Sequence, residues 1–429
     1  MQGAEIKAHA RAGDAGPAEA EGCVIPVDIA ASKALAIARP VRERETLRLL
    51  EAGGRVLAHD LCASVRIPPF DNSAMDGYAV DLEQFRGAGP WTLRVAGRVA
   101  AGDRGAAALP SPDTAVRIFT GAQVPAGCNA VVMQEHCQTS GGQVEFAKRP
   151  RPGENIRKAG EDVEPGAIIA RVGDRLTPRT LALLAGAGIA KTEVFRKVRI
   201  GLVSTGSELR NPGQVLEAGQ IYNSNRILIR AMLARYAWAE VVDFGIVPDR
   251  PTNLARVLGE AAGCCDAVIT TGGVSAGDED HVVAALDRHG TRLEVLKVAM
   301  RPGKPLKIGL IGNTLFAGLP GNPNATLVTF RQIALPAIRS IAGLGNVTPE
   351  WQPGIAGFDY AKKLGRTEYV PVRAVGRDDL GRPVLEMLGR GSSASLSTMA
   401  LADGIAMLAP DSAMIESGSP LRYEPFCTC

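Results

Sequence analysis

Residues 198–208 read Val-Arg-Ile-Gly-Leu-Val-Ser-Thr-Gly-Ser-Glu, an apolar run that ends in a small polar turn. Its length and its Val, Ile and Leu content are typical of a parallel strand buried on both faces. Segments of alternating type follow. Strands are predicted at 241–247, 267–271, 293–298 and 314–317, and helices at 223–236, 251–263, 280–289 and 325–341. This alternation predicts an open, doubly wound α/β sheet within residues 193–344.

The chain before this domain has a different pattern. Helices are predicted from Asp28 to about Arg39, again after Pro40, and from Pro178 to Gly186, so we expect segments 23–55 and 148–192 to form one helical linker domain. The helix after Pro40 rests on the spacing of Val41, Leu47 and Leu50. Between the two segments, short β-type runs predict a small antiparallel domain inserted at 56–147. These runs are 92–95, 115–119, 130–133 and 143–146.

The two ends of the chain differ from each other. Residues 1–22 are rich in Ala, Gly and Glu without an apolar stretch, which predicts a disordered extension and no signal peptide. After Gly343–Gly345, short β-type runs return at 369–375, 384–388 and 405–408. They predict a smaller β domain at 345–429.

Bulk composition excludes several classes of function. A length of 429 residues predicts two to four domains, and 46% hydrophobic with 22% charged residues is ordinary for a soluble protein. The net charge of +3 is too small to indicate a nucleic-acid partner. The longest apolar run, 181–190, is too short to cross a membrane. The 8 cysteines are scattered without zinc-site spacing, so we expect reduced thiols in a cytoplasmic protein.

Polar, glycine-containing loops follow the predicted strands at 204–208, 248–249, 270–280 and 318–323. Ligands of doubly wound sheets bind beyond the carboxyl ends of the strands. Thr-Gly-Gly-Val-Ser at 271–275 is a candidate phosphate cradle, although it has neither the P-loop nor the Rossmann pattern. Glu208, Asp249 and Asp280 are oxygen ligands of the kind that suits Mg²⁺ beside a phosphate. The alternative for Asp280 is a helix cap.

Three further stretches are unusual. Met-Arg-Pro-Gly-Lys-Pro at 300–305 is stiffened by proline and predicts a rigid clamp for an oxyanion, the alternative being two solvated cations on a loop. Ile67 to Ala79 contains Pro-Pro-Phe-Asp-Asn-Ser-Ala-Met-Asp-Gly-Tyr-Ala, and residues 117–122 read Arg-Ile-Phe-Thr-Gly-Ala. Turn chemistry alone would explain either of the last two.

Together these motifs resemble the molybdopterin molybdenumtransferases, the MoeA family that includes the E domain of gephyrin. The resemblance rests on residues 68–79, 117–122, 160–162, 204–209, 271–280, 301–305 and 318–323, and extends from Ile25 to the C-terminus. It implies a two-segment helical domain, an inserted β domain, a molybdopterin-binding α/β domain and a C-terminal β-barrel domain. It also implies a homodimer whose active sites lie between the α/β domain of one subunit and the β domain of the other.

The same resemblance implies a reaction. Family members take adenylylated molybdopterin and molybdate to the molybdenum cofactor and AMP, with Mg²⁺ as cofactor. A molybdopterin adenylyltransferase and molybdoenzyme acceptors are the expected protein partners, and neither nucleic acid nor membrane is expected. Two alternatives remain open: an adenylyltransferase, because its fold resembles the α/β domain alone, and a molybdopterin-binding carrier or scaffold without turnover.

Carried over by motif, Asp71, Thr120, Asp162 and Glu208 are the expected catalytic residues, with Asp71 and Thr120 supplied by the partner. Glu208, Asp249 and Asp280 are the expected metal ligands. The expected substrate-binding residues are Thr205, Gly272, Gly273, Ser275, Arg301, Pro302, Lys304, Pro305, Asn322, Pro323, Arg366 and Ser393.

The chain departs from the family pattern at several positions of the expected anion site. Arg301 stands where Lys is common, which keeps the charge and changes the donor geometry. Asn324-Ala325 replaces a common Val-Ser, so a hydroxyl is missing there unless Asn324 or Thr326 substitutes for it. Arg250 and Pro371 stand where an acid and a second Arg are frequent.

The metal and cap interpretations of Asp280 differ in what Asp280→Asn does. Asn caps a helix about as well as Asp, so both interpretations predict a stability change of a few tenths of a kcal/mol. Only the metal interpretation predicts loss of Mg²⁺-dependent AMP release, on the order of 10²-fold. The measurement is AMP release against Mg²⁺ concentration, with melting temperatures alongside. Unchanged Mg²⁺ dependence in the folded variant would leave Asp280 as a cap.

Overall fold

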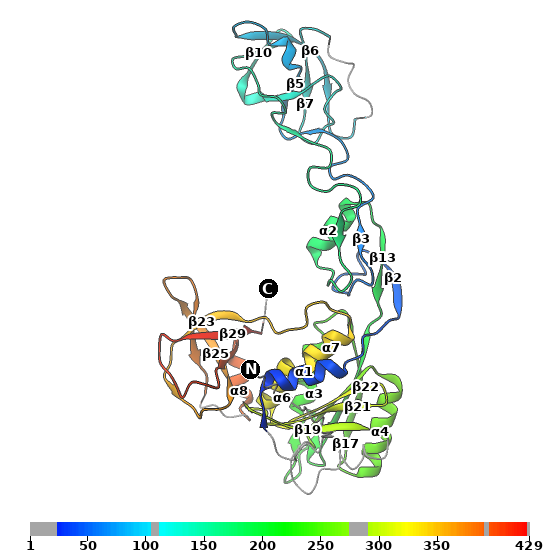
Figure 1. The fold of residues 1–429 in the computed structure, drawn as a ribbon, viewed down its shortest axis with the longest axis vertical. Coiled ribbons are helices and arrows are strands. Elements are labelled where there is room, and N and C mark those ends of the chain that lie inside the picture. The colour runs from blue at the N-terminus through cyan, green and yellow to red at the C-terminus, as the bar shows by residue number, and fades with distance from the viewer. Residues whose placement is uncertain (1–23, 104–110, 274–290, 390–393, 427–429) are drawn as a thin grey trace, which may run out of the picture. The chain divides into compact units, whose positions relative to one another are not determined.

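The computed structural model describes residues 24–103, 111–273, 291–389 and 394–426 (Figure 1). The expectations for residues 1–22, Ser275, the helix at 280–289 with Asp280, and Ser393 lie outside these residues. The chain divides into two compact units. Unit 1 takes the described residues of 1–41, 198–342 and 346–429, and unit 2 takes those of 42–197 and 343–345.

A seven-stranded sheet forms the centre of unit 1, in the order β1-β19-β21-β22-β18-β14-β17. Neighbours are parallel from β22 to β17, as predicted, whereas β21 is antiparallel to both of its neighbours. The strands are β1 (Val24–Ile25), β14 (Val198–Thr205), β17 (Ala239–Val247), β18 (Ala267–Thr271), β19 (Arg292–Val298), β21 (Pro305–Ile311) and β22 (Thr314–Leu319).

Strands β1 and β21 were not predicted. Ile311 pairs with Thr314 across the loop Gly312-Asn313, so β21 and β22 form a hairpin with a two-residue turn. Gly312 has a φ of 61°, as such turns require. Gly-Asn between two apolar runs was therefore a usable sequence signal for β21.

Helices cover both faces of this sheet. Helix α4 (Pro251–Cys264) packs on Val203, Val268 and Phe316. Side chains alternate along a strand, so Leu202 points away from that face, and it is fully buried as well. The remaining helices of unit 1 are α1 (Val27–Ile37), α3 (Ser224–Leu233), α6 (Pro323–Thr329), α7 (Leu335–Ile341) and α8 (Leu396–Leu401).

The helix predicted at 325–341 is found as α6 and α7 joined by one π turn, Phe330–Ala334. Helix α1 contacts this π turn and α7, so it belongs with unit 1. Among the residues that the structure describes, no helix is both long and apolar enough to cross a bilayer.

The C-terminal strands of unit 1 close into a barrel. Strand β25 pairs with β26 on one side and with β27 on the other, which closes the ring β25-β26-β23-β29-β27. Val372, Leu385 and Ala406 are fully buried in its core. This confirms the expected β-barrel domain. Its strands are β23 (Gln352–Ala356), β25 (Thr367–Arg377), β26 (Pro383–Met387), β27 (Gly404–Leu408) and β29 (Pro420–Pro425), with a side pair β24 (Tyr360–Ala361) and β28 (Met414–Ile415).

Unit 2 begins with a correction. The segment predicted as a second helix is instead strand β2 (Arg44–Arg48), which pairs antiparallel with β13 (Lys191–Phe195). The helical spacing was misleading because Leu50 is 96% exposed and contributes nothing to a core. Helix α2 (Pro178–Gly186) forms as predicted and buries Leu184 against Leu57 and Val194. Strands β3 (Leu61–Cys62) and β12 (Ile168–Ala170) complete this part of unit 2.

A six-stranded sheet forms the rest of unit 2, in the order β8-β5-β7-β6-β10-β9. All of the predicted runs are present as strands. The sheet is antiparallel as predicted except between β6 and β7, which are parallel. The strands are β5 (Gly77–Val80), β6 (Trp91–Val99), β7 (Thr114–Ile118), β8 (Ala130–Met133), β9 (Cys137–Ser140) and β10 (Gln143–Phe146), with a separate pair β4 (Asn72–Ser73) and β11 (Ile156–Arg157).

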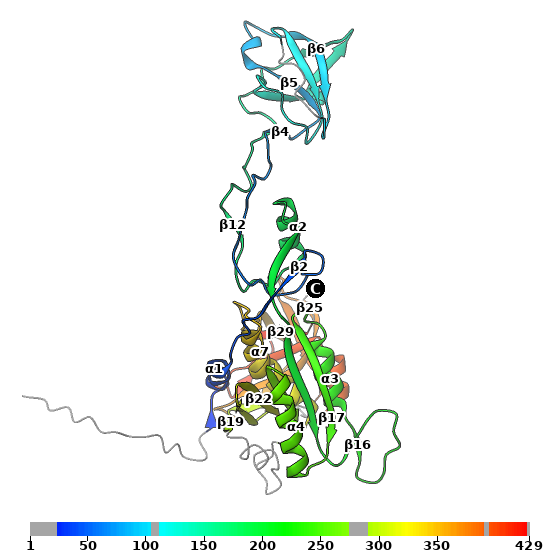
Figure 2. The same cartoon turned by 90° about the vertical axis from the view of Figure 1, so that its right-hand side faces the viewer.

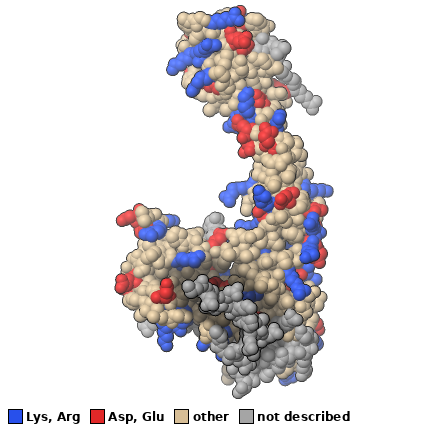
Figure 3. Space-filling view, viewed as in Figure 1, with Lys and Arg blue, Asp and Glu red and all other residues tan. Residues whose placement is uncertain are grey.

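Cations and anions are mixed on the surface. Lys and Arg side chains are interspersed with Asp and Glu over the visible described face (Figure 3). This mixture agrees with the small net charge. On this face the mixture does not form the single-sign patch that would steer a polyanion.

A buried ion pair joins the barrel to the α/β domain. Glu424 in β29 accepts hydrogen bonds from Arg331 Nε at 3.0 Å and from Gln332 Nε2 at 2.6 Å, both in the π turn. Both members of the pair are largely buried. A buried charge that loses its partner is strongly destabilising.

Removal of the Glu424 carboxylate leaves Arg331 buried without its counter-charge. We expect Glu424→Ala to lower the free energy of unfolding by about 3–5 kcal/mol. The matched control is Glu386→Ala, because Glu386 pairs with Arg373 at 2.8 Å on the same barrel with both side chains about half exposed. That change costs under about 1 kcal/mol. Denaturant unfolding measures the free energy of unfolding of both variants. Equal losses of stability in the two variants would contradict this account of the buried Glu424–Arg331 ion pair.

Candidate active site

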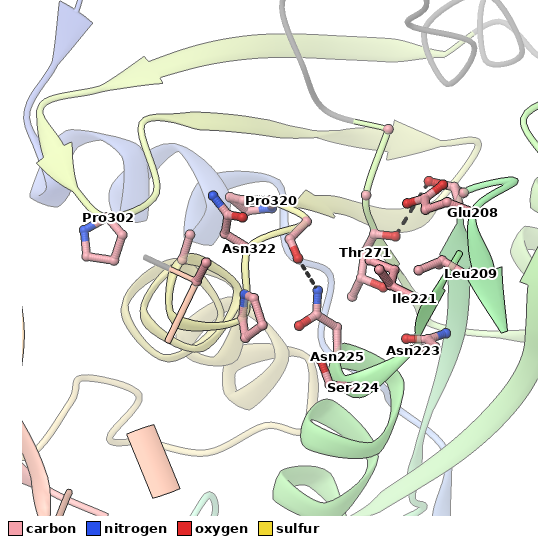
Figure 4. A pocket seen from close by; sticks show the side chains of 18 of the residues that line it. Glu208, Leu209, Ile221, Asn223, Ser224, Asn225, Thr271, Pro302, Pro320 and Asn322 are labelled. Carbon is pink, nitrogen blue, oxygen red and sulfur yellow. Dashed lines mark hydrogen bonds between the residues drawn. The ribbon is translucent and has the colours of Figure 1, made fainter. Parts of the chain in front are cut away.

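A cavity of about 1180 Å³ lies in unit 1 beyond the C-terminal ends of the parallel strands (Figure 4). Strand ends, the start of α3 and the 301–305 turn supply its walls. Many of the residues expected in the site line it together. They are Thr205, Glu208, Asp249, Gly272, Gly273, Arg301, Pro302, Lys304, Pro305, Asn322 and Pro323.

Two carboxylates stand on one wall. Asp249 Oδ2 accepts from the Ser207 N–H at 3.1 Å, and the Asp249 N–H donates to Ser207 Oγ at 3.3 Å. The carboxylate of Glu208 folds back over Gly206, where a Cβ atom would lie 2.6 Å from Glu208 Oε2. Gly206 has a φ of 150°, a backbone conformation that other residues rarely adopt, so the turn after β14 favours glycine at this position.

These two acids are compatible with a Mg²⁺ ion. Mg²⁺ is commonly held by one or two carboxylates together with substrate phosphates. Within the described residues no three His, Cys, Asp or Glu side chains gather as a metal site. Glu208 and Asp249, the two described acids of the expected ligand set, both line the cavity.

The turn after β18 depends on a close backbone approach. Gly272 has a φ of 90°, and a Cβ atom there would lie 2.4 Å from the Thr205 carbonyl oxygen. The Gly272 N–H donates to the Leu319 carbonyl at 3.1 Å. This N–H is thus used within the sheet, so Gly272 shapes the proposed phosphate cradle without offering it a donor.

A buried lysine that sequence reasoning missed supports the same turn. Lys307, in β21, is 1% exposed, and its Nζ donates to the Gly273 carbonyl at 3.0 Å. Burial lowers the pKa of Lys307 to about 8. A lysine in the middle of the apolar run 306–311 was the available sign of a buried polar role.

The start of α3 was predicted only as a helix cap. Asn223 does cap α3, since its Oδ1 accepts from the Arg226 N–H at 3.1 Å. Asn225 Nδ2 donates to the Gly321 carbonyl at 2.6 Å, which ties α3 to the Pro320–Pro323 turn (Figure 4). Both asparagines line the cavity. Strands β15 (Leu209–Arg210) and β16 (Ile221–Tyr222) precede α3, and the loop between them extends beyond the rest of this domain (Figure 2).

Arg301 and Lys304 form the basic wall of the cavity, which lies where the α/β domain meets the barrel. Arg301 belongs to β20 (Met300–Arg301), and its Nη1 lies 3.4 Å from Glu368 Oε2 and 3.3 Å from Tyr360 Oη. Arg366 is bound to the same carboxylate, with its Nε 2.8 Å from Glu368 Oε1. Arg366 is not among the described residues that line the cavity. Sequence reasoning missed Glu368 and Tyr360, although an acid within the apolar strand 367–372 was a signal.

The Asn324-Ala325 departure can now be placed. Ala325 lines the cavity, while Asn324 Nδ2 donates to the Ser395 carbonyl at 3.2 Å. Thr326 Oγ1 is fully buried and bonded to the Pro320 carbonyl at 2.5 Å. The Thr326 hydroxyl therefore holds the turn at the cavity rather than facing a ligand.

The remaining expected residues that the structure describes lie in unit 2. Asp71 accepts from Lys158 Nζ and from the Ala159 N–H, both at 2.8 Å, and these bonds hold its pKa below the usual value. Thr120 donates through its N–H and its Oγ1 to Asp76 Oδ1, each at 2.8 Å. These bonds lower the pKa of Asp76, a residue not singled out before. Asp162 is exposed, and its N–H donates to the Ile67 carbonyl at 3.1 Å.

Comparison with known proteins gives one family along the chain. Residues 25–188 match the MoeA N-terminal region (domain I and II). Residues 201–340 match a probable molybdopterin binding domain, and residues 353–426 match the MoeA C-terminal region (domain IV).

Individual relatives agree. The molybdopterin molybdenumtransferase of Haemophilus influenzae is 36% identical over 411 residues, covering 94% of this chain and 99% of the relative. That of Bacillus subtilis is 34% identical over 407 residues, covering 93% of each. A crystal structure of the molybdopterin biosynthesis MoeA protein from Pyrococcus horikoshii OT3 superposes with a TM-score of 0.79 at 27% identity, over 94% of this chain and 100% of that one. The chain belongs to the molybdopterin molybdenumtransferase family, the transferases of molybdenum-cofactor biosynthesis.

Proposed function

We propose that the chain transfers molybdenum from molybdate to the dithiolene of adenylylated molybdopterin, with Mg²⁺ present, and releases AMP. One observation carries this proposal. A single cavity has two carboxylates, Glu208 and Asp249, and two cations, Arg301 and Lys304, on its walls. A substrate with a phosphoanhydride and a second, separate oxyanion needs this combination.

Glu208 and Asp249 form the acidic wall of the cavity, and this wall suits the phosphoanhydride. A carboxylate repels phosphate unless a cation lies between them, so Glu208 and Asp249 make sense beside phosphates as ligands of Mg²⁺. When bound, the ion would polarise phosphorus and offset the phosphate charge. Asp249 is held ready by its paired bonds with Ser207, and Asp280 is the expected further ligand.

The basic wall suits molybdate. Arg301 ends β20 and Lys304 directly precedes β21, and Pro302 and Pro305 limit the backbone freedom of this stretch. Two cations fixed before substrate arrives stabilise a dianion without reorganisation. Their role here is to hold molybdate for ligand exchange with the dithiolene sulfurs.

Other parts of the proposal rest on the family resemblance. A homodimer would supply Asp71, Thr120 and Asp162 of a partner subunit to the reaction. The chain would work in the cytoplasm, receiving its substrate from a molybdopterin adenylyltransferase and passing its product to molybdoenzymes.

Purified protein with adenylylated molybdopterin tests the proposal. We expect AMP release that requires both molybdate and Mg²⁺. Arg301→Ala should raise KM for molybdate by about 10-fold or more, since a charge-assisted contact is lost. The control is Arg373→Ala, whose guanidinium is exposed and bound to Glu386 on the barrel. AMP release that does not depend on molybdate would refute the proposed reaction. An unchanged KM for molybdate in Arg301→Ala would refute the proposed anion site.

A further inference from the structure

The buried Glu368 carboxylate contacts Arg301 of the basic wall but has no role in the proposed reaction. Glu368 is 1% exposed and lies in β25 of the barrel. Its Oε2 accepts from Tyr360 Oη at 3.0 Å and faces Arg301 Nη1 at 3.4 Å. Its Oε1 accepts from Arg366 Nε at 2.8 Å and forms an ion pair with Arg366 Nη2 at 2.7 Å. One carboxylate thus joins two arginines and a tyrosine.

The backbone fixes the same pairing. Strand β20 adds to the barrel sheet in parallel with β25, and Arg301 is the register partner of Glu368. The Thr367 N–H also donates to the Ala299 carbonyl at 2.9 Å. The turn that carries Arg301 and Lys304 is therefore attached to the barrel at the position where Glu368 stands.

The Arg301 side chain contacts a buried carboxylate and also reaches the cavity. It is 42% exposed and lines the cavity, whereas its carboxylate partner is buried. A long, flexible side chain loses conformational entropy when it is fixed in one position. Because the buried Glu368 carboxylate already fixes Arg301 in the free protein, less of this entropy is lost when a ligand binds. Tyr360 and Arg366 in turn hold the carboxylate.

We propose that Glu368 is a positioning residue that holds Arg301 in the cavity for the incoming oxyanion, with Arg366 and Tyr360 acting through it. The inference rests on the proposed molybdate site at Arg301. It moves Arg366 from direct contact with the anion to support of Arg301. It also gives the barrel domain a role in substrate binding through Glu368.

Positioning and simple electrostatics predict opposite results. A negative charge near the site weakens anion binding, so its removal strengthens binding if charge alone matters. If Glu368 positions Arg301, the same removal weakens binding. Misplacement of a contact by about 1 Å costs on the order of 10²-fold in well-ordered sites. The sign of the change therefore separates the two accounts.

The experiment compares Glu368→Gln and Glu368→Asp with wild type. Glu368→Gln removes the charge, and Glu368→Asp keeps the charge but withdraws the carboxylate by one methylene. We expect both to raise KM for molybdate on the order of 10-fold or more, with KM for adenylylated molybdopterin nearly unchanged. Equilibrium dialysis with molybdate alone gives a readout independent of turnover. Tyr360→Phe should cause a smaller change of the same sign.

Controls keep each outcome decisive. Glu386→Gln removes an exposed partner of Arg373 on the same barrel and should leave both KM values unchanged. If Glu368→Gln fails to fold, Glu368→Asp carries the test. Tighter molybdate binding in Glu368→Gln with an unchanged Glu368→Asp would overturn positioning in favour of charge alone. An unchanged KM for molybdate in Arg301→Ala would instead refute the molybdate site itself. A raised KM for molybdate in Arg301→Ala, together with an unchanged KM in both Glu368 variants, would refute only the positioning role.

Discussion

The close approach of two strand ends is the constraint on which the cavity depends. Gly272 passes so near the Thr205 carbonyl that a single added methyl group would collide with it. This approach lets the turns after β14 and β18 share one edge of the sheet, with Glu208 and Asp249 on one side of it. Lys307 then holds the turn after β18 through a hydrogen bond to the Gly273 carbonyl. Any larger residue at 272 would push these two turns apart.

The barrel completes what the α/β domain begins. Arg301 and Lys304 lie on a turn that leaves the sheet at β19 and returns as β21, and β20 within it pairs with the barrel. Glu424 and Arg331 form a second, buried link between the same two domains. The basic wall is thus set by contacts between domains, whereas the acidic wall is set within one sheet. This division explains why a small α/β fold alone would carry only half of the site.

Local patterns predicted much of this from sequence. Strand β18 and helix α4 were expected almost to the residue, because a buried apolar run and a Pro-led amphipathic helix are local signals. Strand β2 was mistaken for a helix, since only its partner β13 selects the extended form. Glu368 and Lys307 were missed because their importance comes from burial and from partners far along the chain. Gly272 was expected to bind substrate within the candidate phosphate cradle, and the bond of its N–H to the Leu319 carbonyl depends on a strand pairing that sequence does not reveal.

The central claim is that one cavity binds the phosphates at its acidic wall and molybdate at its basic wall. Anomalous scattering from molybdenum in crystals grown with molybdate tests it most directly, because the signal marks that element alone. The account predicts an anomalous peak within hydrogen-bonding distance of Arg301 and Lys304, with Glu368 still bound to Arg301. A well-occupied anomalous peak elsewhere in unit 1, with no peak beside Arg301 and Lys304, would contradict the account.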